Sequence, residues 1–293
     1  MLAQDAPEPV PRPRARAERP RRRAKIPGLN PLLFLWRQRH LILHTTLSDI
    51  RGRYTGSVLG FAWALLNPVL LLSVYVVLYV FILRIRLPGR ETDSPLEYTL
   101  VIFAGLIPWF GFAESTASSL GSVVANASLL HNTSFPAPVL PVKAVLASMV
   151  GQVVGLVLLL TLLAASHHAT VYWLFLPVAL GAQLALSLGL GWILSALNVF
   201  IRDLAQAISA ILLFAMLASP IAFTADFVRD SRLHLVLDLN PLSYLINLYR
   251  VPLVYGRAPA LVDLVVAPLV GLLFFWLGFR FFVRIRPHLA DHV

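Results

Sequence analysis

The sequence has no cysteine and few charged residues. Of its 293 residues, 13% are charged and 58% are hydrophobic, and the mean hydropathy is +0.77. Without cysteine the chain has no disulfide, no thiolate nucleophile and no cysteine-ligated metal. An average soluble domain carries roughly 25% charged residues, so this chain has too little polar surface to face water on all sides. The composition predicts an integral membrane protein.

Lysine is also scarce, since the 24 basic residues include only Lys25 and Lys143. A nucleotide-binding P-loop needs a lysine in the pattern G-x-x-x-x-G-K-[ST], because that side chain reaches the β- and γ-phosphates. Neither lysine stands in this pattern. We therefore predict that the chain is not a P-loop ATPase and that any ATP hydrolysis takes place on another polypeptide.

The basic residues are concentrated at the N-terminus. Residues 1–56 hold 12 basic against 4 acidic residues, whereas the other 237 residues hold 12 against 10. Seven arginines and several prolines between Pro11 and Lys25 repel one another and break helices, so residues 1–28 are predicted to be a disordered cytoplasmic tail. Nucleic-acid binding is the alternative function for such a tail. The positive-inside rule and attraction to anionic headgroups explain it more simply, and no nucleic-acid partner is expected.

Six weakly charged runs reach the ~20 residues that a bilayer-spanning helix needs. They are Ser57–Leu83, Tyr98–Ser122, Ala144–Ser166, Ala169–Ile201, Leu204–Ala225 and Pro259–Val283. An even number of spans places both termini on one side. The arginines before the first run and after the last run make that side cytoplasmic. The predicted fold is an all-α membrane protein with a six-span domain over residues 57–285 and a cytoplasmic C-terminus over residues 286–293.

Two further segments flank these spans. Between the fifth and sixth runs, Asn240-Pro241 divides a moderately apolar stretch into two half-helices, because proline removes a backbone donor and disfavours helix at the preceding residue. We expect a re-entrant hairpin there, with a surface loop as the alternative. Before the first span, residues 29–56 place Trp36, Leu43 and Leu47 on one stripe, which predicts an amphipathic interface helix. That helix serves either as a platform for a cytoplasmic partner or as a simple anchor.

Four segments resemble one family of proteins. They are Asp49–Pro68 (DIRGRYTGSVLGFAWALLNP), Gly105–Leu130 (GLIPWFGFAESTASSLGSVVANASLL), Leu197–Gln206 (LNVFIRDLAQ) and Asn240–Gly256 (NPLSYLINLYRVPLVYG). They are similar to segments of the permease subunits of ABC-2 type exporters, in particular the branch that exports O antigen, capsule, teichoic acid and related glycans. The first segment is similar to that branch's D-[IL]-[KR]-x-R-Y-x-x-S-x-L-G-x-x-W-x-x-L-x-P signature at almost every defined position.

The resemblance implies a homodimer in the bacterial cytoplasmic (inner) membrane that binds two copies of a separate ABC ATPase subunit, on which ATP and magnesium act. It also implies a continuous channel for a lipid-linked glycan between the two permeases. As a permease subunit, the chain itself is then expected to be no enzyme and to hold no cofactor and no metal. The residues that it places at the ATPase subunit are Asp49, Arg53, His131, Asn132, Phe135 and Pro136. The family usually has arginine after this Phe-Pro pair, whereas this chain has Ala137, which predicts a partner with a less acidic groove.

A glycan channel needs aromatic faces on which sugar rings stack and a few polar groups. Tyr75 and Tyr79 share one face of the first span, and Trp109 and Phe112 lie in the second. Such aromatic residues also pack in cores or face lipid. Glu114 is a carboxylate at membrane depth, which normally faces a cavity, a bundle interior or a partner. We assign these five residues to the substrate path, with hydrogen bonding of Glu114 to nearby hydroxyls as the structural alternative.

The remaining predicted site residues follow from the third and fourth segments. The resemblance makes Arg202 and Asp203 a gate between the fourth and fifth spans, whereas charge alone favours a solvated turn. It also places Asn240, Pro241, Tyr244 and Arg250 in the re-entrant hairpin.

The predicted function is the transmembrane subunit of an ATP-driven exporter of a lipid-linked polysaccharide. An ABC-2 exporter of small amphiphiles, drugs or lipids is the alternative within transport. A membrane-embedded glycosyltransferase is less favoured, because it would need paired carboxylates to hold a metal or act as a base, and the acids of this sequence are scattered.

Overall fold

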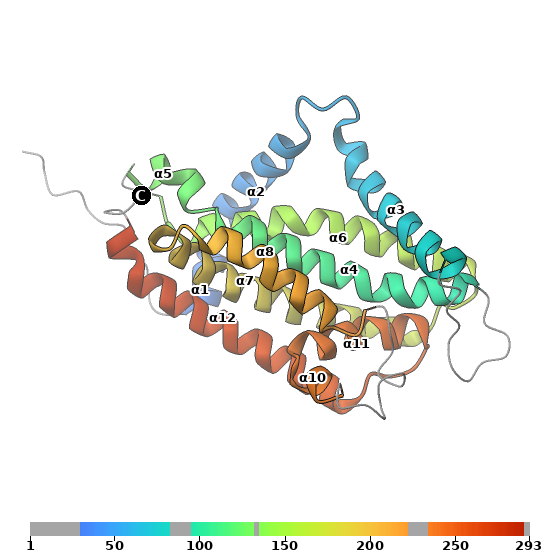
Figure 1. The fold of residues 1–293 in the computed structure, drawn as a ribbon. Helices are drawn as coiled ribbons and strands as arrows, with labels where there is room; N and C mark the ends of the chain where they lie inside the picture. Colours follow the sequence, from blue (N-terminus) through green and yellow to red (C-terminus); the bar gives the residue numbers. More distant parts are fainter. Residues whose placement is uncertain (1–29, 83–94, 132–134, 222–233, 290–293) are drawn as a thin grey trace, which may run out of the picture.

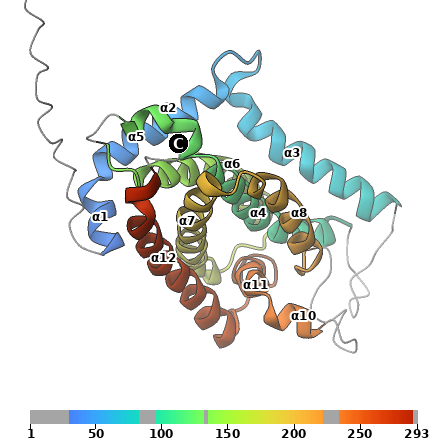
Figure 2. The same cartoon turned by 60° about the vertical axis from the view of Figure 1, so that its left-hand side comes forward.

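The computed structural model describes residues 30–82, 95–131, 135–221 and 234–289, and within these ranges the chain is helical and contains no strand. The predicted disordered tail therefore lies outside the described residues. Figures 1 and 2 show a bundle in which α7 lies near the centre, with α12, α6, α4 and α8 around it. The predicted all-helical class is confirmed.

The N-terminal segment forms two helices where one was predicted. The α1 helix spans Pro31–Arg37 and α2 spans Arg39–Tyr54, with the break at Gln38. The α1 helix begins at Pro31 because the Asn30 side chain accepts hydrogen bonds from the N–H groups of Leu32 and Leu33 and proline fills the first helical position.

The side chains predicted as the apolar stripe of this segment point away from the bundle. Trp36, Leu43 and Leu47 are exposed, whereas Ile42 and Thr46 are buried. The segment thus presents apolar side chains on a face that the protein does not cover.

Among the residues that the structure describes, four helices are long and apolar enough to cross a membrane. They are α4 (Pro95–Leu120), α6 (Val139–Ala165), α7 (Leu176–Phe200, preceded by the short helix η4, Val171–Phe175) and α12 (Leu261–Leu289). These helices match four of the six predicted spans, and α12 continues past residue 285 into the predicted C-terminal segment.

The other two predicted spans are shorter apolar helices in the described residues. The first is the stretch Gly60–Val76, which contains η1 (Gly60–Ala62) and α3 (Trp63–Val76); a π-helical segment, η2, continues it over Val77–Ile82. The second is α8, Leu204–Leu217. Figures 1 and 2 both show α3 leaning away from the bundle, so that it contacts the rest of the chain along one side only.

Glycines allow α7 and α12 to pack against each other at the main chain. A Cβ atom at Gly189 would overlap the backbone of Phe274, and one at Gly278 would overlap the carbonyl of Gly189. Seven residues earlier on both helices, a Cβ atom at Gly271 would overlap the carbonyl of Ala182. Position numbers increase together along this contact, so the two helices run parallel. Small residues with such spacing are typical of close helix packing in membranes.

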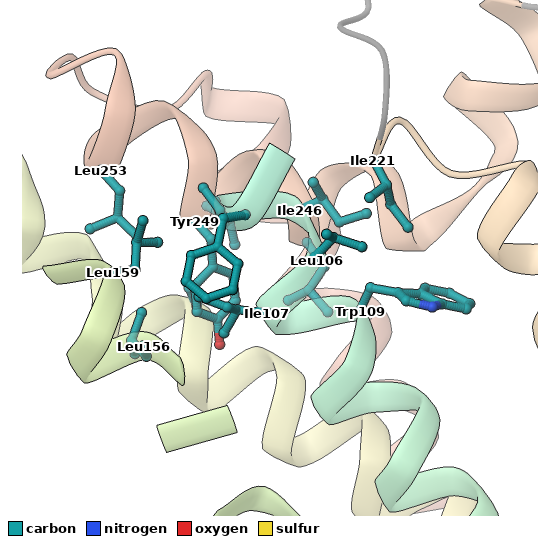
Figure 3. Packing of buried hydrophobic residues seen from close by; sticks show 14 of the residues in the cluster. Leu106, Ile107, Trp109, Leu156, Leu159, Ile221, Ile246, Tyr249 and Leu253 are labelled. Carbon is teal, nitrogen blue, oxygen red and sulfur yellow. The ribbon is translucent and has the colours of Figure 1, made fainter. Parts of the chain in front are cut away.

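The interior contains two groups of apolar side chains. One lies between α4, α6, α7 and α11 (Pro241–Val254), and Figure 3 shows Tyr249 among Leu156, Leu159 and Leu253 in this group. The other joins α1 to α7 and α12, where Phe34 and Trp192 both contact the ring of Phe279.

The chain breaks at Asn240-Pro241 as predicted. The short helix α10 (His234–Leu239) ends there and α11 begins, with the Asn240 side chain accepting from the N–H of Leu242. The same side chain donates to the carbonyl of Ala218 and the hydroxyl of Ser219, just after α8. Asn240 therefore fixes the start of α11 against the end of α8.

Candidate functional site

A cavity of about 450 Å³ lies between α3, α4 and α6. Its walls are mostly apolar, with Tyr54, Asn67, Glu114 and Gln152 as the main polar groups. Tyr54, the last residue of α2, borders the cavity, and burial together with the nearby Glu114 carboxylate raises its pKa. Its phenol is therefore protonated at neutral pH.

Glu114 forms an ion pair with Arg53 at the edge of this cavity. Arg53 donates from Nη1 to Glu114 Oε1 at 2.7 Å and from Nη2 to Ser118 Oγ at 3.2 Å. Ser118 follows Glu114 by one turn of α4, so the guanidinium binds two neighbouring positions on that helix. The structural alternative for Glu114 predicted hydroxyl partners, whereas the structure pairs its carboxylate with Arg53 near the end of α2.

A second ion pair joins α2 to α6. The ammonium group of Lys143 donates to Asp49 Oδ1 at 3.0 Å and to Asn126 Oδ1 at 3.2 Å. Asn126 is held in turn by its donation to the carbonyl of Ser122. Lys143 is only 7% exposed, so this cation lies inside the protein among acceptors from two other segments.

Deeper in the bundle, amides and a phenol form what we call the glutamine cluster, consisting of Gln152, Gln183, Tyr249 and the carbonyl of Pro108. The two glutamines exchange hydrogen bonds of 2.8 Å in both directions. Gln183 also donates to the Pro108 carbonyl and accepts from the Tyr249 hydroxyl. Gly111 leaves room for this arrangement, because a Cβ atom there would overlap Gln152. The cluster links α4, α6, α7 and α11.

The predicted substrate-path aromatics occupy different environments. Trp109 and Phe112 are 3% and 6% exposed and pack in the interior, so within one chain they offer no face for a sugar ring. Tyr75 is partly buried against the same interior group. Tyr79 lies in η2, and its side chain lies outside what the structure describes.

The predicted ATPase-docking loop is described only in part. Phe135 is partly buried and Pro136 is buried at the start of α6, while Asn132 and the side chain of His131 lie outside the described residues. The two predicted gate residues, Arg202 and Asp203, are exposed in the turn between α7 and α8, where the Asp203 carbonyl accepts from the N–H groups of Gln206 and Ala207.

In the predicted hairpin, Arg250 is buried and donates to the carbonyls of Val101 and Ile221. It thereby connects α11 to the first half of α4 and to the segment after α8. Tyr244 donates to the carbonyl of Asp238 and joins α11 to α10. Both side chains fix the position of α11.

Sequence reasoning missed Lys143, Gln152 and Gln183. Each is a polar residue in a long apolar run, and that signal was available in the sequence. The hydrogen-bond partners of these three residues could not be predicted from the sequence, because they lie 17 to 97 positions away along the chain.

The long apolar helices and the buried polar links between them define a multi-span membrane protein. Comparison of the sequence with known families gives a match to the ABC-2 type transporter family over residues 41–254. The chain belongs to this family, as the four motifs predicted.

Three relatives illustrate the similarity. The O-antigen export system permease protein RfbA of Myxococcus xanthus is 30% identical over 261 residues, which cover 88% of this chain and 97% of the relative. RfbA of Klebsiella pneumoniae is 29% identical over 72% of this chain and 78% of the relative. The polysialic acid transport protein KpsM of Escherichia coli is 23% identical over 70% of this chain and 77% of the relative.

Proposed function

We propose that the chain is the transmembrane subunit of an ATP-driven exporter of a lipid-linked polysaccharide in the bacterial inner membrane. The observation that carries the proposal is the similarity over 97% of the length of a relative named as an O-antigen export permease. The absence of a P-loop lysine from the sequence supports a separate ABC ATPase subunit as the motor.

The direction of the helices supports six spans and a re-entrant hairpin. Since α7 and α12 run parallel, a chain that crosses the membrane in both must cross it once more between them. We assign that crossing to α8, so α10 and α11 enter and leave on the same side. The contacts of Arg250 with Val101 and Ile221 agree with this placement, because they hold α11 beside the start of α4 and the end of α8. Both termini are then cytoplasmic.

We further propose a homodimer with two ATPase subunits. The α3 and α8 helices each leave an apolar face uncovered, with Leu70, Val74, Phe214 and Leu217 among the exposed side chains. A second copy placed against these faces would form a channel between the two chains. Tyr75 and Tyr79 remain the proposed stacking residues of this channel, and Arg202 with Asp203 its cytoplasmic gate.

Export by the reconstituted complex tests this function. The chain is co-purified with its ABC ATPase subunit and placed in liposomes with the lipid-linked glycan, and an external glycosidase reports the glycan that has crossed. We expect ATP-dependent crossing, which stops when the Walker lysine of the ATPase is replaced. The chain alone should hydrolyse no ATP. Movement of small amphiphiles but not of glycan would favour the alternative, an exporter of small amphiphiles. The 450 Å³ cavity has a suitable size for such a molecule.

A crosslink tests the docking surface and the topology. Asn132→Cys should react with a cysteine on the ATPase subunit and with reagents on the cytoplasmic side only. Val171→Cys is the matched control, because Val171 is exposed in the turn before α7 and is expected on the outer side. The natural chain has no cysteine to interfere. Labelling of position 132 from the outer side would contradict the proposed topology and indicate the reverse orientation.

A further inference from the structure

The ammonium group of Lys143 connects three segments that are distant in sequence. It lies on α6 and binds Asp49 of α2 and Asn126 of the short helix η3 (Val124–Asn126). Asn126 is itself fixed to the turn that follows α4 by its bond to the Ser122 carbonyl. A displacement of η3 therefore acts on Lys143 and, through it, on α2.

The α2 helix is fixed at a second point one turn further on. Arg53 follows Asp49 by four residues and binds Glu114 and Ser118 of α4. Four residues of α-helix rise ~6 Å, so the two attachments lie close together on one side of α2. The helix is thus attached to both α4 and α6.

The ends of this chain of contacts have different surroundings. Asn126 belongs to the segment that leads to Phe135 and Pro136, where the ATPase subunit is proposed to dock. Glu114 borders the cavity between α3, α4 and α6. The connection runs from Asn126 through Lys143 to Asp49, along one turn of α2 to Arg53, and from Arg53 to Glu114. It thus joins the docking side to the edge of the cavity.

The two ion pairs also have an alternative arrangement. Asp49 and Arg53 are four residues apart on one helix, with the acidic residue N-terminal, which is the favoured order for an ion pair within a helix. When α2 moves away from the bundle, these side chains can pair with each other. Asp49 and Arg53 then compensate each other's charge, while Lys143 and Glu114 each lose the charged partner that they have in the structure.

We propose that Lys143 and Arg53 are positioning residues that transmit the movement of the ATPase subunit to α4, with α2 as the moving element. In the attached arrangement, the Asp49–Lys143 and Arg53–Glu114 pairs hold α2 on the bundle. In the detached arrangement, Asp49 pairs with Arg53 and α4 is released at the edge of the cavity. The inference rests on the proposed function, because the movement originates in ATP hydrolysis by a partner.

Exchanging the charges of one pair tests this inference in the reconstituted complex. Arg53→Glu and Glu114→Arg are each expected to lower the amount of glycan exported per ATP hydrolysed about tenfold, within the usual range of coupling between sites. Glu114→Arg should leave assembly with the ATPase and the rate of ATP hydrolysis within about twofold of the unmodified complex, because Glu114 lies beside the cavity and the ATP site is on the other subunit. Since Arg53 was predicted to lie at the ATPase subunit, export by Arg53→Glu is normalised to the amount of assembled complex. The combined exchange restores the pair in reverse and should recover most of the export per ATP. Lys143→Met should cause a loss similar to that of the single exchanges.

Arg51→Glu is the matched control. Arg51 is exposed on the same helix, so the same change of charge there should leave export per ATP unchanged. Arg53→Gln is measured in parallel, because it removes the ion pair without bringing two carboxylates together.

Three outcomes would overturn the inference: normal export per ATP in Arg53→Gln, failure of the combined exchange to improve on the single ones, or an equal loss in Arg51→Glu. Failure of the unmodified complex to export glycan would instead refute the proposed function. The two proposals can thus fail separately.

Discussion

Replacing Gln183 by leucine tests how strongly the glutamine cluster holds the bundle together. The substitution removes four hydrogen bonds and leaves the amide of Gln152 and the hydroxyl of Tyr249 buried with fewer partners. Hydrogen bonds between membrane helices contribute ~0.6 kcal/mol each on average, and a buried polar group without a partner costs about 1–3 kcal/mol. We expect Gln183→Leu to lower the free energy of unfolding by about 2–4 kcal/mol.

Two companion variants separate the hydrogen bonds from the packing. Tyr249→Phe removes one hydroxyl and leaves the reciprocal amide pair intact, so we expect a loss of about 0.5–1.5 kcal/mol. The double variant Gln152→Leu with Gln183→Leu removes both amides together. Its loss should be smaller than the sum of the single losses by about 1–2 kcal/mol, because neither amide is left behind without its partner.

The assay is reversible unfolding of the purified chain in mixed detergent micelles, followed by tryptophan fluorescence and circular dichroism. Gln206→Leu is the matched control, because Gln206 is exposed on α8. This substitution should change the free energy of unfolding by no more than about 0.5 kcal/mol. The reasoning is refuted if the single losses are additive to within ~0.3–0.5 kcal/mol, or if the control costs as much as Gln183→Leu.

The remaining predictions concern packing and the channel. Gly189→Ala should destabilise the chain by about 1–3 kcal/mol in the same unfolding assay, because the added Cβ atom would overlap α12. Gly181→Ala, on the same helix with open space around it, should be neutral or stabilising. Equal effects of the two substitutions would refute the close contact. Trp192→Phe removes a buried hydrogen bond to a carbonyl just before α6 and should cost about 1–3 kcal/mol; a loss below 0.5 kcal/mol would contradict this role. If the rings line the channel, the double variant Tyr75→Ala with Tyr79→Ala should lower export per assembled complex without lowering ATP hydrolysis. A smaller amount of assembled complex with normal export per complex would assign both rings to packing.

Features that depend on local sequence were predicted well. Weakly charged runs predicted the positions of α4, α6, α7 and α12, and the Asn240-Pro241 pair predicted the break between α10 and α11. Both signals act within a few residues. The prediction of a single interface helix over residues 29–56 was less accurate, because composition gives no strong signal for the break at Gln38.

Long-range contacts could not be predicted in this way. Arg53 and Glu114 are 61 positions apart, and no periodic pattern connects an arginine at the end of one helix to a carboxylate inside another. Trp109 and Phe112 were assigned to the substrate path from their residue type alone. Their burial depends on how α4 packs against its neighbours, which the sequence of α4 does not specify.

The contact between α7 and α12 has a consequence for the transport cycle. Where a main chain lies directly against another main chain, there are no side-chain rotamers that can adjust to a rotation or a sliding movement. The close backbone contact at Gly189 and Gly278, which leaves no room for a Cβ atom, resists even small displacements of one helix along the other. We therefore expect α7 and α12 to move as one rigid body during export, so that the deformation falls on helices with more adaptable contacts, such as α3.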